Sequence, residues 1–306
     1  MSRRLSPIIL VLLLVLAGCA SHDQDAQDST AAPDTEATFP VTIGPVTITS
    51  RPDRIVSLSP SATETLYAVG AGRQVVAVDS LSDYPPEAPH TQLSSLSPDP
   101  EAIAGYHPDL VVASADQNTL GAALAKIGVP LLVMSDAKTL DQAYDEFVQL
   151  GKATGHQAEG ESLARQTGSD IDKIVADTPK PARPLTYYYE LDQTYYSATS
   201  ATFIGSVLSR FGLENIADGE NPGVSGGYPQ LSAERILQSN PDLIFLADSR
   251  CCGQNAQTVG ARPGWGTLTA VRDGDVFALD DDIASRWSPR IVDLVRAVSD
   301  AVTKSR

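Results

Sequence analysis

Short apolar runs alternate with helix-periodic segments along most of the chain. Residues 140–153 and 157–177 carry apolar side chains at helical spacing, and Gly155 ends the first helix. The 21 residues of the second would span roughly 30 Å, enough to connect two lobes in one crossing. This alternation predicts parallel sheets. The other predicted elements are a hairpin over 41–49, strands over 54–58, 75–78, 110–114, 130–134, 185–189, 243–247 and 276–279, and helices over 62–69, 119–127, 203–211 and 289–304.

A sixteen-residue stretch, 97–112 (SPDPEAIAGYHPDLVV), returns later in the chain as 230–245 (QLSAERILQSNPDLIF). Each copy has a capping residue, Asp99 or Ser232, ahead of a short helix with a glutamate in its first turn, Glu101 or Glu234. A Pro-Asp-Leu segment then ends the helix and leads into an apolar strand. The repeat therefore indicates two similar α/β lobes, each presenting one carboxylate at the same place. A single glutamate there could simply favour the positive end of the helix dipole, but a matched pair suggests a two-point contact surface.

The beginning of the chain is typical of an exported protein. A positive region at Arg3 and Arg4 precedes the apolar residues 8–16, and Leu16-Ala17-Gly18-Cys19 resembles the lipobox of bacterial lipoproteins. Its apolar core is shorter than the ~20 residues that cross a membrane. We expect a signal peptide over 1–18, a lipidated Cys19 and a flexible, acidic tether over 19–38, so that the protein is extracytoplasmic and anchored to a bacterial membrane.

The charge balance excludes one class of partner. Lys and Arg number 22 against 38 Asp and Glu, for a formal net charge of -16. Binding to a nucleic-acid backbone needs clustered cations, and after residue 4 the sequence has no basic run. We therefore expect no nucleic-acid partner.

Several motifs together resemble the metal-chelate class of substrate-binding proteins of ABC importers, which capture vitamin B12, ferric siderophores or haem. The resemblance covers roughly residues 50–304, and the vitamin B12-binding members look closest. It rests on the lipobox, the opening 54–64 (RIVSLSPSATE), the loop 82–86 (SDYPP), the paired Pro-Asp-Leu repeats and the ending 286–291 (RWSPRI).

The resemblance implies an α/β fold of two Rossmann-like lobes with parallel sheets, joined by a single long rigid helix, with a ligand cleft between them. We expect an N-terminal lobe over 39–137, a helical segment with the interlobe helix over 138–177 and a C-terminal lobe over 178–306. In the family, paired glutamates meet arginines on the two permease subunits, which work with a cytoplasmic ATPase, and Glu101 and Glu234 match those positions. The expected protein is a monomer without an intrinsic cofactor, whose ligand is a cobalt corrinoid or an iron chelate.

Ligands of open α/β sheets bind beyond the carboxyl ends of the strands, which makes the loops after the strands the candidate ligand contacts. The resemblance adds aromatic positions, the polar pair Asp282 and Arg286, and Trp287 as a wall of the site. An arginine could donate to a corrin amide, a siderophore oxygen or a haem carboxylate, so it does not choose among them. One departure counts against cobalamin, because Ser114 stands where the B12 binder has a tryptophan. The candidates are Ser59, Ser61, Asp83, Tyr84, Ser114, Tyr189, Tyr196, Tyr228, Asp282, Arg286 and Trp287.

Cys251 and Cys252 are neighbours in the chain and, with Cys19 lipidated, would be the remaining thiols of a protein in an oxidising compartment. Adjacent Cα atoms lie about 3.8 Å apart across a trans peptide, below the usual disulfide range, so a vicinal bridge would be strained. The alternatives are two free thiols, an intermolecular bridge or ligation of a soft metal. We expect the bridge, near the mouth of the cleft.

Three other functions remain as alternatives. An enzyme finds little support, because the sequence has no nucleophile elbow, His-Glu-x-x-His or Walker loop. A receptor for bare zinc or manganese needs about three histidines and a carboxylate around one metal, whereas His22, His90, His107 and His156 fall at scattered, surface-like places, so no metal ligand is expected. A surface adhesin would need the tether but no aromatic cleft.

Overall fold

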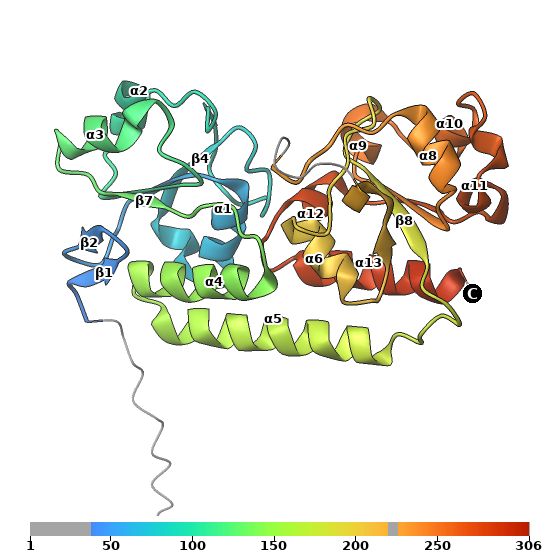
Figure 1. The fold of residues 1–306 in the computed structure, drawn as a ribbon. Helices are drawn as coiled ribbons and strands as arrows, with labels where there is room; N and C mark the ends of the chain where they lie inside the picture. Colours follow the sequence, from blue (N-terminus) through green and yellow to red (C-terminus); the bar gives the residue numbers. More distant parts are fainter. Residues whose placement is uncertain (1–37, 220–225, 306) are drawn as a thin grey trace, which may run out of the picture. The chain divides into compact units, whose positions relative to one another are not determined.

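Two parallel β-sheets, one in each lobe, organise the protein (Figure 1). The computed structural model describes residues 38–219 and 226–305, and residues Thr35–Arg306 form one compact unit that contains both lobes. The N-terminal lobe has a five-stranded sheet in the order β5-β4-β3-β6-β7. Its strands are β3 (Ile55–Leu58), β4 (Val75–Asp79), β5 (His90–Leu93), β6 (Leu110–Ala113) and β7 (Leu131–Val133).

The helices of this lobe are α1 (Pro60–Ala68), α2 (Pro100–Ala104) and α3 (Leu120–Ala125), with 3-10 turns over Ala71–Gln74 and Gln117–Thr119. The predicted hairpin at its start is confirmed as the antiparallel pair β1 (Val41–Ile43) and β2 (Val46–Ile48).

The C-terminal lobe has a four-stranded parallel sheet in the order β11-β10-β8-β9. Its strands are β8 (Thr186–Glu190), β9 (Glu214–Asn215), β10 (Leu243–Leu246) and β11 (Val276–Ala278). Its helices are α6 (Phe203–Ser209), α8 (Ala233–Ser239), α9 (Ser249–Cys252), α10 (Ala256–Gly260), α11 (Thr269–Asp273), α12 (Asp281–Ser285) and α13 (Ile291–Lys304), with 3-10 turns over Ile216–Gly219 and Trp265–Thr267.

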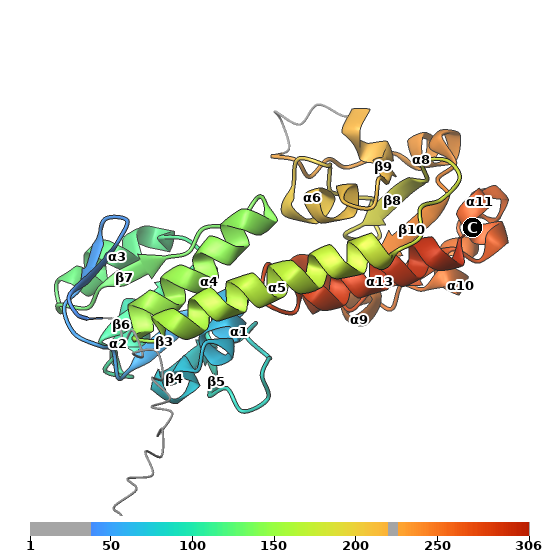
Figure 2. The same ribbon diagram turned by 90° about the horizontal axis from the view of Figure 1, so that it is seen from below.

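Helices α4 (Leu140–Thr154) and α5 (Gln157–Asp177) connect the lobes, and α5 has the bounds expected from the sequence. In Figure 1, α5 passes beneath both lobes, and Figure 2 shows it from below with α13 alongside. The structure adds α4 to the connection. Leu140 and Phe147 pack into the core of the C-terminal lobe, whereas Leu150 and Ala153 of the same helix belong to the core of the N-terminal lobe. One rigid helix is therefore shared by two hydrophobic cores.

The duplicated stretch adopts equivalent structures in the two lobes. The Asp99 carboxylate caps α2 by accepting from the Glu101 N–H at 2.9 Å, and the Ser232 hydroxyl caps α8 by accepting from the Arg235 N–H at 3.1 Å. The aspartate of each Pro-Asp-Leu segment holds the start of the neighbouring strand. Asp109 accepts from the Arg54 N–H at 2.9 Å, and Asp242 accepts from the Thr186 N–H at 2.9 Å. The repeat therefore specifies a cap, a short helix and the register of two strands.

Several elements were not predicted from the sequence, namely β5, β9 and the short helices α9 to α12. These are brief segments whose apolar residues do not complete a period. The predicted signal peptide over 1–18 and Cys19 lie outside the described residues, as does the tether over 19–38 apart from Thr38. Among the residues that the structure describes, no helix is long and apolar enough to cross a bilayer.

The contact between α4 and α5 can be tested with a single methyl group. A Cβ on Gly160 would lie 2.6 Å from the Phe147 carbonyl oxygen, whereas a Cβ on Gly168, in the same helix, would make an ordinary 3.4 Å contact with the Tyr144 ring. We expect Gly160→Ala to lower the free energy of unfolding by about 1–3 kcal/mol. The control Gly168→Ala should raise it by up to about 1 kcal/mol in denaturant titrations. Equal effects of the two substitutions would contradict this description of the helix crossing.

Candidate ligand-binding cleft

A cavity of about 430 Å³ lies where loops of the two lobes meet. The N-terminal lobe contributes the loops at the carboxyl ends of β3, β4 and β6, and the C-terminal lobe contributes α12 and the residues after it. This is the edge at which ligands of open α/β sheets bind. The lining residues are Ser59, Pro60, Ser61, Ser80, Leu81, Asp83, Ser114, Asp282, Ser285, Arg286 and Trp287. Seven of the eleven residues proposed from the sequence are therefore brought together here.

Arg286 joins the two lobes at this cavity. Its guanidinium donates to Asp282 at 2.6 Å within its own lobe, and to Asp83 at 3.0 Å and Glu64 at 2.8 Å in the other lobe. It also donates to the Leu81 carbonyl oxygen at 3.0 Å, and only 10% of the side chain is exposed. The positive charge of Arg286 is thus already matched by carboxylates.

Glu64, in α1, is the most buried charged residue of this network, with 2% of its side chain exposed. Besides Arg286, it accepts from the Arg290 Nε–H at 2.9 Å and from the Ser288 hydroxyl. All three partners come from the C-terminal lobe. A buried carboxylate needs such pairing because desolvation of an unpaired charge is costly. The residues around Glu64 therefore fasten the lobes to each other beside the cavity.

The carboxyls of Asp83 and Asp282 approach each other across the cavity and share Arg286. Burial raises the pKa of Asp282, and the negative charge of Asp83 adds to this effect. Burial acts on Asp83 too, but hydrogen bonding to Arg286 and the charge of Arg286 lower the pKa of Asp83 below its usual value. As the pH falls, Asp282 is therefore protonated before Asp83.

A second cavity, of about 310 Å³, is connected to the first by a hydrogen bond between one residue of each lining. The Trp287 indole N–H, in the wall of the first cavity, donates to the Glu146 carboxylate of α4 at 3.0 Å. Burial raises the pKa of Glu146 to about 8, against the hydrogen bond from Trp287 and with the help of Asp136. The second cavity is lined by Val133, Met134, Ser135, Asp136, Ala137, Lys138, Gln142, Asp145, Glu146 and Gln149.

The candidate tyrosines differ in their placement. The expectation that Tyr189 lines the cleft is corrected, because its side chain is 0% exposed and its hydroxyl donates to the Ala284 carbonyl oxygen at 2.8 Å in the core. Tyr196 and Tyr228 are 41% and 37% exposed. Burial and the nearby Asp136 carboxylate raise the pKa of Tyr228, but neither Tyr196 nor Tyr228 lines the two cavities. Tyr84 is 42% exposed and stacks under the Arg290 guanidinium, 4.1 Å from its ring centre.

Glu101 and Glu234 are exposed, each in the first turn of its helix, α2 or α8. Figure 1 draws both helices on the side of the lobes that faces away from α5. Neither glutamate lines the two cavities described above. Their exposure leaves both carboxylates accessible to another protein.

Cys251 and Cys252 form a disulfide within α9, with their Cα atoms 3.8 Å apart. Both residues are exposed. The helix follows β10 and is bonded to the segment Asp280 to Asp282, which contributes to the first cavity.

The described histidines lie in separate surroundings. The His156 ring contacts Arg51 and Gln74, whereas the His90 ring contacts the Ser82 carbonyl oxygen. Within residues 38–219 and 226–305, no group of three or more His, Cys, Asp or Glu is arranged to hold a metal ion. His22 lies outside these ranges.

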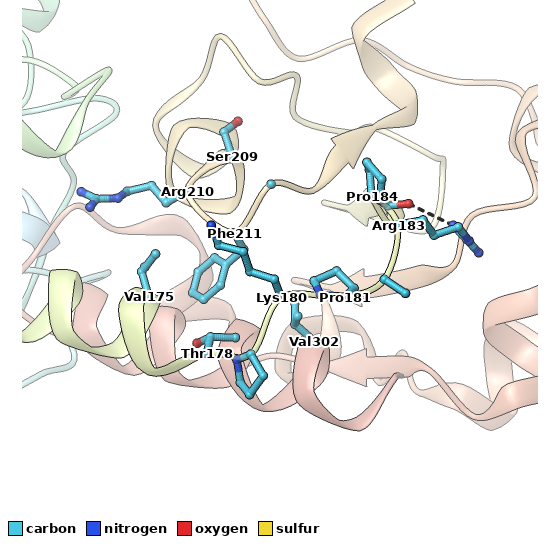
Figure 3. Close-up of a pocket in the computed structure, with 13 residues that line it drawn as sticks. Val175, Thr178, Lys180, Pro181, Arg183, Pro184, Ser209, Arg210, Phe211 and Val302 are labelled. Atoms are coloured by element: carbon cyan, nitrogen blue, oxygen red, sulfur yellow. Dashed lines mark hydrogen bonds between the residues drawn. The ribbon is translucent and has the colours of Figure 1, made fainter.

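A third cavity, of about 410 Å³, lies away from the cleft, at the end of α5 (Figure 3). Proline side chains and Phe211 contribute much of its wall. Its arginines are already paired: Arg183 donates to Asp242 at 2.6 Å, and Arg210 donates to Asp172 at 2.7 Å. Since this cavity shares no lining residue with the first cavity, we do not assign it to the same site.

Comparison with known proteins shows which family has this sequence and fold. Residues 55–283 match the periplasmic binding protein family. The chain belongs to that family. This confirms the resemblance that the motifs indicated, and with it the two-lobed α/β fold.

Three relatives span most of this member of the family. An uncharacterized ABC transporter substrate-binding lipoprotein, YvrC of Bacillus subtilis, is 30% identical over 96% of this chain and 95% of its own length. The crystal structure of the periplasmic vitamin B12 binding protein BtuF of Vibrio cholerae matches with a TM-score of 0.68 and 29% identity, over 83% of this chain and 98% of that one. The periplasmic heme-binding protein RhuT from Roseiflexus sp. RS-1 matches with a TM-score of 0.70 and 25% identity, over 83% and 98%.

Sequence reasoning missed Glu64 and Glu146 as residues of the cleft region. Glu64 closes the opening motif 54–64, but its partners lie more than two hundred positions later in the chain. The one signal in the sequence is that this glutamate stands among uncharged residues, Thr63, Thr65 and Leu66, within a predicted helix. Glu146 lies on the amphipathic α4, where an acid normally faces solvent.

Removing the charge of Glu64 should destabilise this family member strongly. Glu64→Gln would leave Arg286 and Arg290 without their buried counter-charge, and we expect a loss of about 3–5 kcal/mol in the free energy of unfolding. The control Glu161→Gln removes an exposed partner of Arg165 at 3.9 Å and should cost less than about 1 kcal/mol. Denaturant titrations that gave Glu64→Gln the stability of the control would contradict the role of this network.

Glu146 should make stability depend on pH. Its folded-state pKa is raised from 4.5 to about 8, so its contribution is fully present below 4.5 and is lost as the pH rises through 8. The melting temperature of the wild type should therefore fall between about pH 5 and pH 8, and less so in Glu146→Gln. Asp248, whose pKa burial and Glu190 raise to about 7, titrates in both proteins, so the difference between them isolates Glu146. Parallel curves would show that Glu146 has no raised pKa.

Proposed function

We propose that this protein captures a cobalt corrinoid outside the cytoplasm and delivers it to an ABC permease, which imports it with the energy of a cytoplasmic ATPase. Membership of the family, the substrate-binding name of the relative from B. subtilis and the vitamin B12-binding name of the relative from V. cholerae support this function. Lipidation of Cys19 and anchoring to the cell membrane are part of the proposal.

The observation that carries the choice of ligand is the charge of the cavity walls. Five acids line the two cavities: Asp83 and Asp282 in the first, and Asp136, Asp145 and Glu146 in the second. With its pKa raised to about 8, Glu146 is mostly protonated at pH 7, so the negative charge comes from the four aspartates. The two lining cations are Arg286 and Lys138, and Arg286 is already paired with carboxylates. Haem brings carboxylates, and many ferric siderophores carry net negative charge, so these walls would repel them. The amide groups of a corrinoid can instead donate to the acids.

The aromatic walls support the same ligand. Ser114 and Trp287 line the same cavity from opposite lobes. Trp287 can therefore supply the flat apolar surface that the serine at position 114 does not. Tyr228, with 37% of its surface exposed, is a further aromatic candidate for contact with the ligand. A planar macrocycle would gain buried apolar area from such walls.

Competitive binding tests the choice of ligand. The purified protein is titrated with cyanocobalamin, haemin, a ferric catecholate chelate and Zn²⁺. We expect cyanocobalamin to bind at least about tenfold more tightly than either anionic chelate, a difference of about 1.4 kcal/mol. Asp83→Asn plus Asp282→Asn should reduce the difference in affinity between cyanocobalamin and haemin, because haemin should bind more tightly once these two negative charges are removed. Tighter binding of haemin or of the ferric chelate by the wild type would overturn the corrinoid assignment, and a response to Zn²⁺ alone would favour a bare-ion receptor.

Docking to the permease is proposed for Glu101 and Glu234, which are exposed at equivalent places on the two lobes. A two-part permease offering one arginine from each subunit would match one exposed acid on each lobe. Close, desolvated charge pairs across an interface reach coupling energies of about 1.5–7 kcal/mol. Loss of both pairs is therefore enough to prevent a productive complex.

Uptake measurements test this docking role. Glu101→Ala plus Glu234→Ala should abolish corrinoid uptake by cells and leave the Kd for cyanocobalamin unchanged, because neither glutamate lines the cavities. Glu87→Ala plus Glu214→Ala, which removes one exposed acid from each lobe, is the matched control and should leave uptake intact. Weakened cyanocobalamin binding in the first variant, or normal uptake, would reject the assignment.

A further inference from the structure

Helix α9 is fastened to the start of α12 by one carboxylate. Asp281 accepts from the backbone N–H groups of Arg250 at 2.9 Å and Cys251 at 2.7 Å, and from the Ser249 hydroxyl at 3.1 Å. The Ser249 hydroxyl also contacts the Leu279 carbonyl oxygen. The position of α9 and the position of α12 therefore depend on each other.

The Arg250 side chain extends this connection to the ligand cavity. Its guanidinium donates to Asp282 at 2.7 Å and to Asp280 at 3.2 Å. The other oxygen of Asp282 accepts from Arg286 at 2.6 Å, and both Asp282 and Arg286 line the cavity. Arg250 thus holds one side of a carboxylate whose other side belongs to the network of Arg286. It is a positioning residue, because it is absent from the lining of the cavity itself.

The turn that carries Arg250 has little intrinsic stability. Helix α9 has four residues, and none of them is buried. So short a helix is not stable by itself in water. Its last two residues are the disulfide-bonded pair Cys251 and Cys252, which close a small ring directly after Arg250. The exposure of both cysteines leaves the bond open to attack by a thiol.

We propose that the Cys251–Cys252 disulfide is a thiol-exchange site that controls the ligand cleft by fixing the turn from which Arg250 holds Asp282. In the proposed reaction, one thiolate of a dithiol reductant attacks either sulfur and forms a mixed disulfide, and the neighbouring cysteine leaves as a thiolate and takes up a proton. The second thiol of the reductant then releases the other cysteine, so the protein gains two electrons and two protons while the reductant becomes a disulfide. Reduction loosens α9, and Asp282 loses a fixed partner. The consequence for ligand affinity rests on the proposed function.

Hydrogen exchange tests, without any ligand, whether the Cys251–Cys252 disulfide holds α9 against α12. The protein is compared oxidised and after full reduction with dithiothreitol, with thiols counted by a colorimetric reagent. We expect reduction to speed exchange of the Arg250 and Cys251 amides and of the α12 amides. Cys251→Ser plus Cys252→Ser should exchange like the reduced wild type with or without dithiothreitol. Unchanged exchange rates of these amides after complete reduction would overturn the proposal that the disulfide holds α9 in place.

Affinity for cyanocobalamin tests the consequence. Reduction should raise the Kd for cyanocobalamin about tenfold, because that is the effect of losing one hydrogen bond to a charged group. Arg250→Ala should show the weaker Kd in the oxidised state and no further response to dithiothreitol. If reduction still raised the Kd of Arg250→Ala about tenfold, the effect of the disulfide would not act through Arg250, and the proposal would be contradicted. If the oxidised wild type does not bind cyanocobalamin at all, the proposed ligand is wrong. The hydrogen-exchange experiment still tests whether the disulfide holds α9 in place.

Discussion

The buried Glu64 carboxylate is the interaction on which the arrangement of the cleft depends. It lies in the first helix of the N-terminal lobe, and all of its side-chain partners, Arg286, Ser288 and Arg290, come from the C-terminal lobe. Charge-assisted hydrogen bonds of this kind are strong and directional, and a buried charge without them is costly. The network therefore fixes both how far apart the lobes lie and which way Arg286 points into the cavity.

Helix α4 acts on the same junction by a different force. Its first half packs in the core of the C-terminal lobe and its second half in that of the N-terminal lobe, so separation of the lobes would expose apolar surface on one helix. The polar network at the cleft and the apolar packing below it together hold the cavity preformed. A preformed cavity has less ordering entropy to lose when a ligand binds. The same contacts neutralise the charge of Arg286 within the protein. The acidic side chains that line the two cavities therefore dominate the charge that the ligand meets.

The sequence predicted the two lobes, most strands and the helices α4 and α5, because these depend on local periodicity, caps and a visible internal repeat. It also identified seven residues of one cavity: Ser59, Ser61, Asp83 and Ser114 through the rule that ligands bind beyond strand ends, and Asp282, Arg286 and Trp287 through the family resemblance. Tyr189 was wrongly expected at the cleft, because it was chosen as a match to an aromatic position of the family, and such a match does not show that the side chain is covered within its own lobe, here at Ala284. Glu64 was missed because its function comes from arginines distant in sequence, and such pairings are not visible in a local pattern.

Small-angle scattering of the protein with and without saturating cyanocobalamin tests the central claim most directly, since a cleft held by Glu64 and α4 should not need to close around its ligand. The account predicts the same radius of gyration for both samples within experimental error. A clear contraction on binding would contradict it, because the lobes would then have to move against the contacts that are described as holding them.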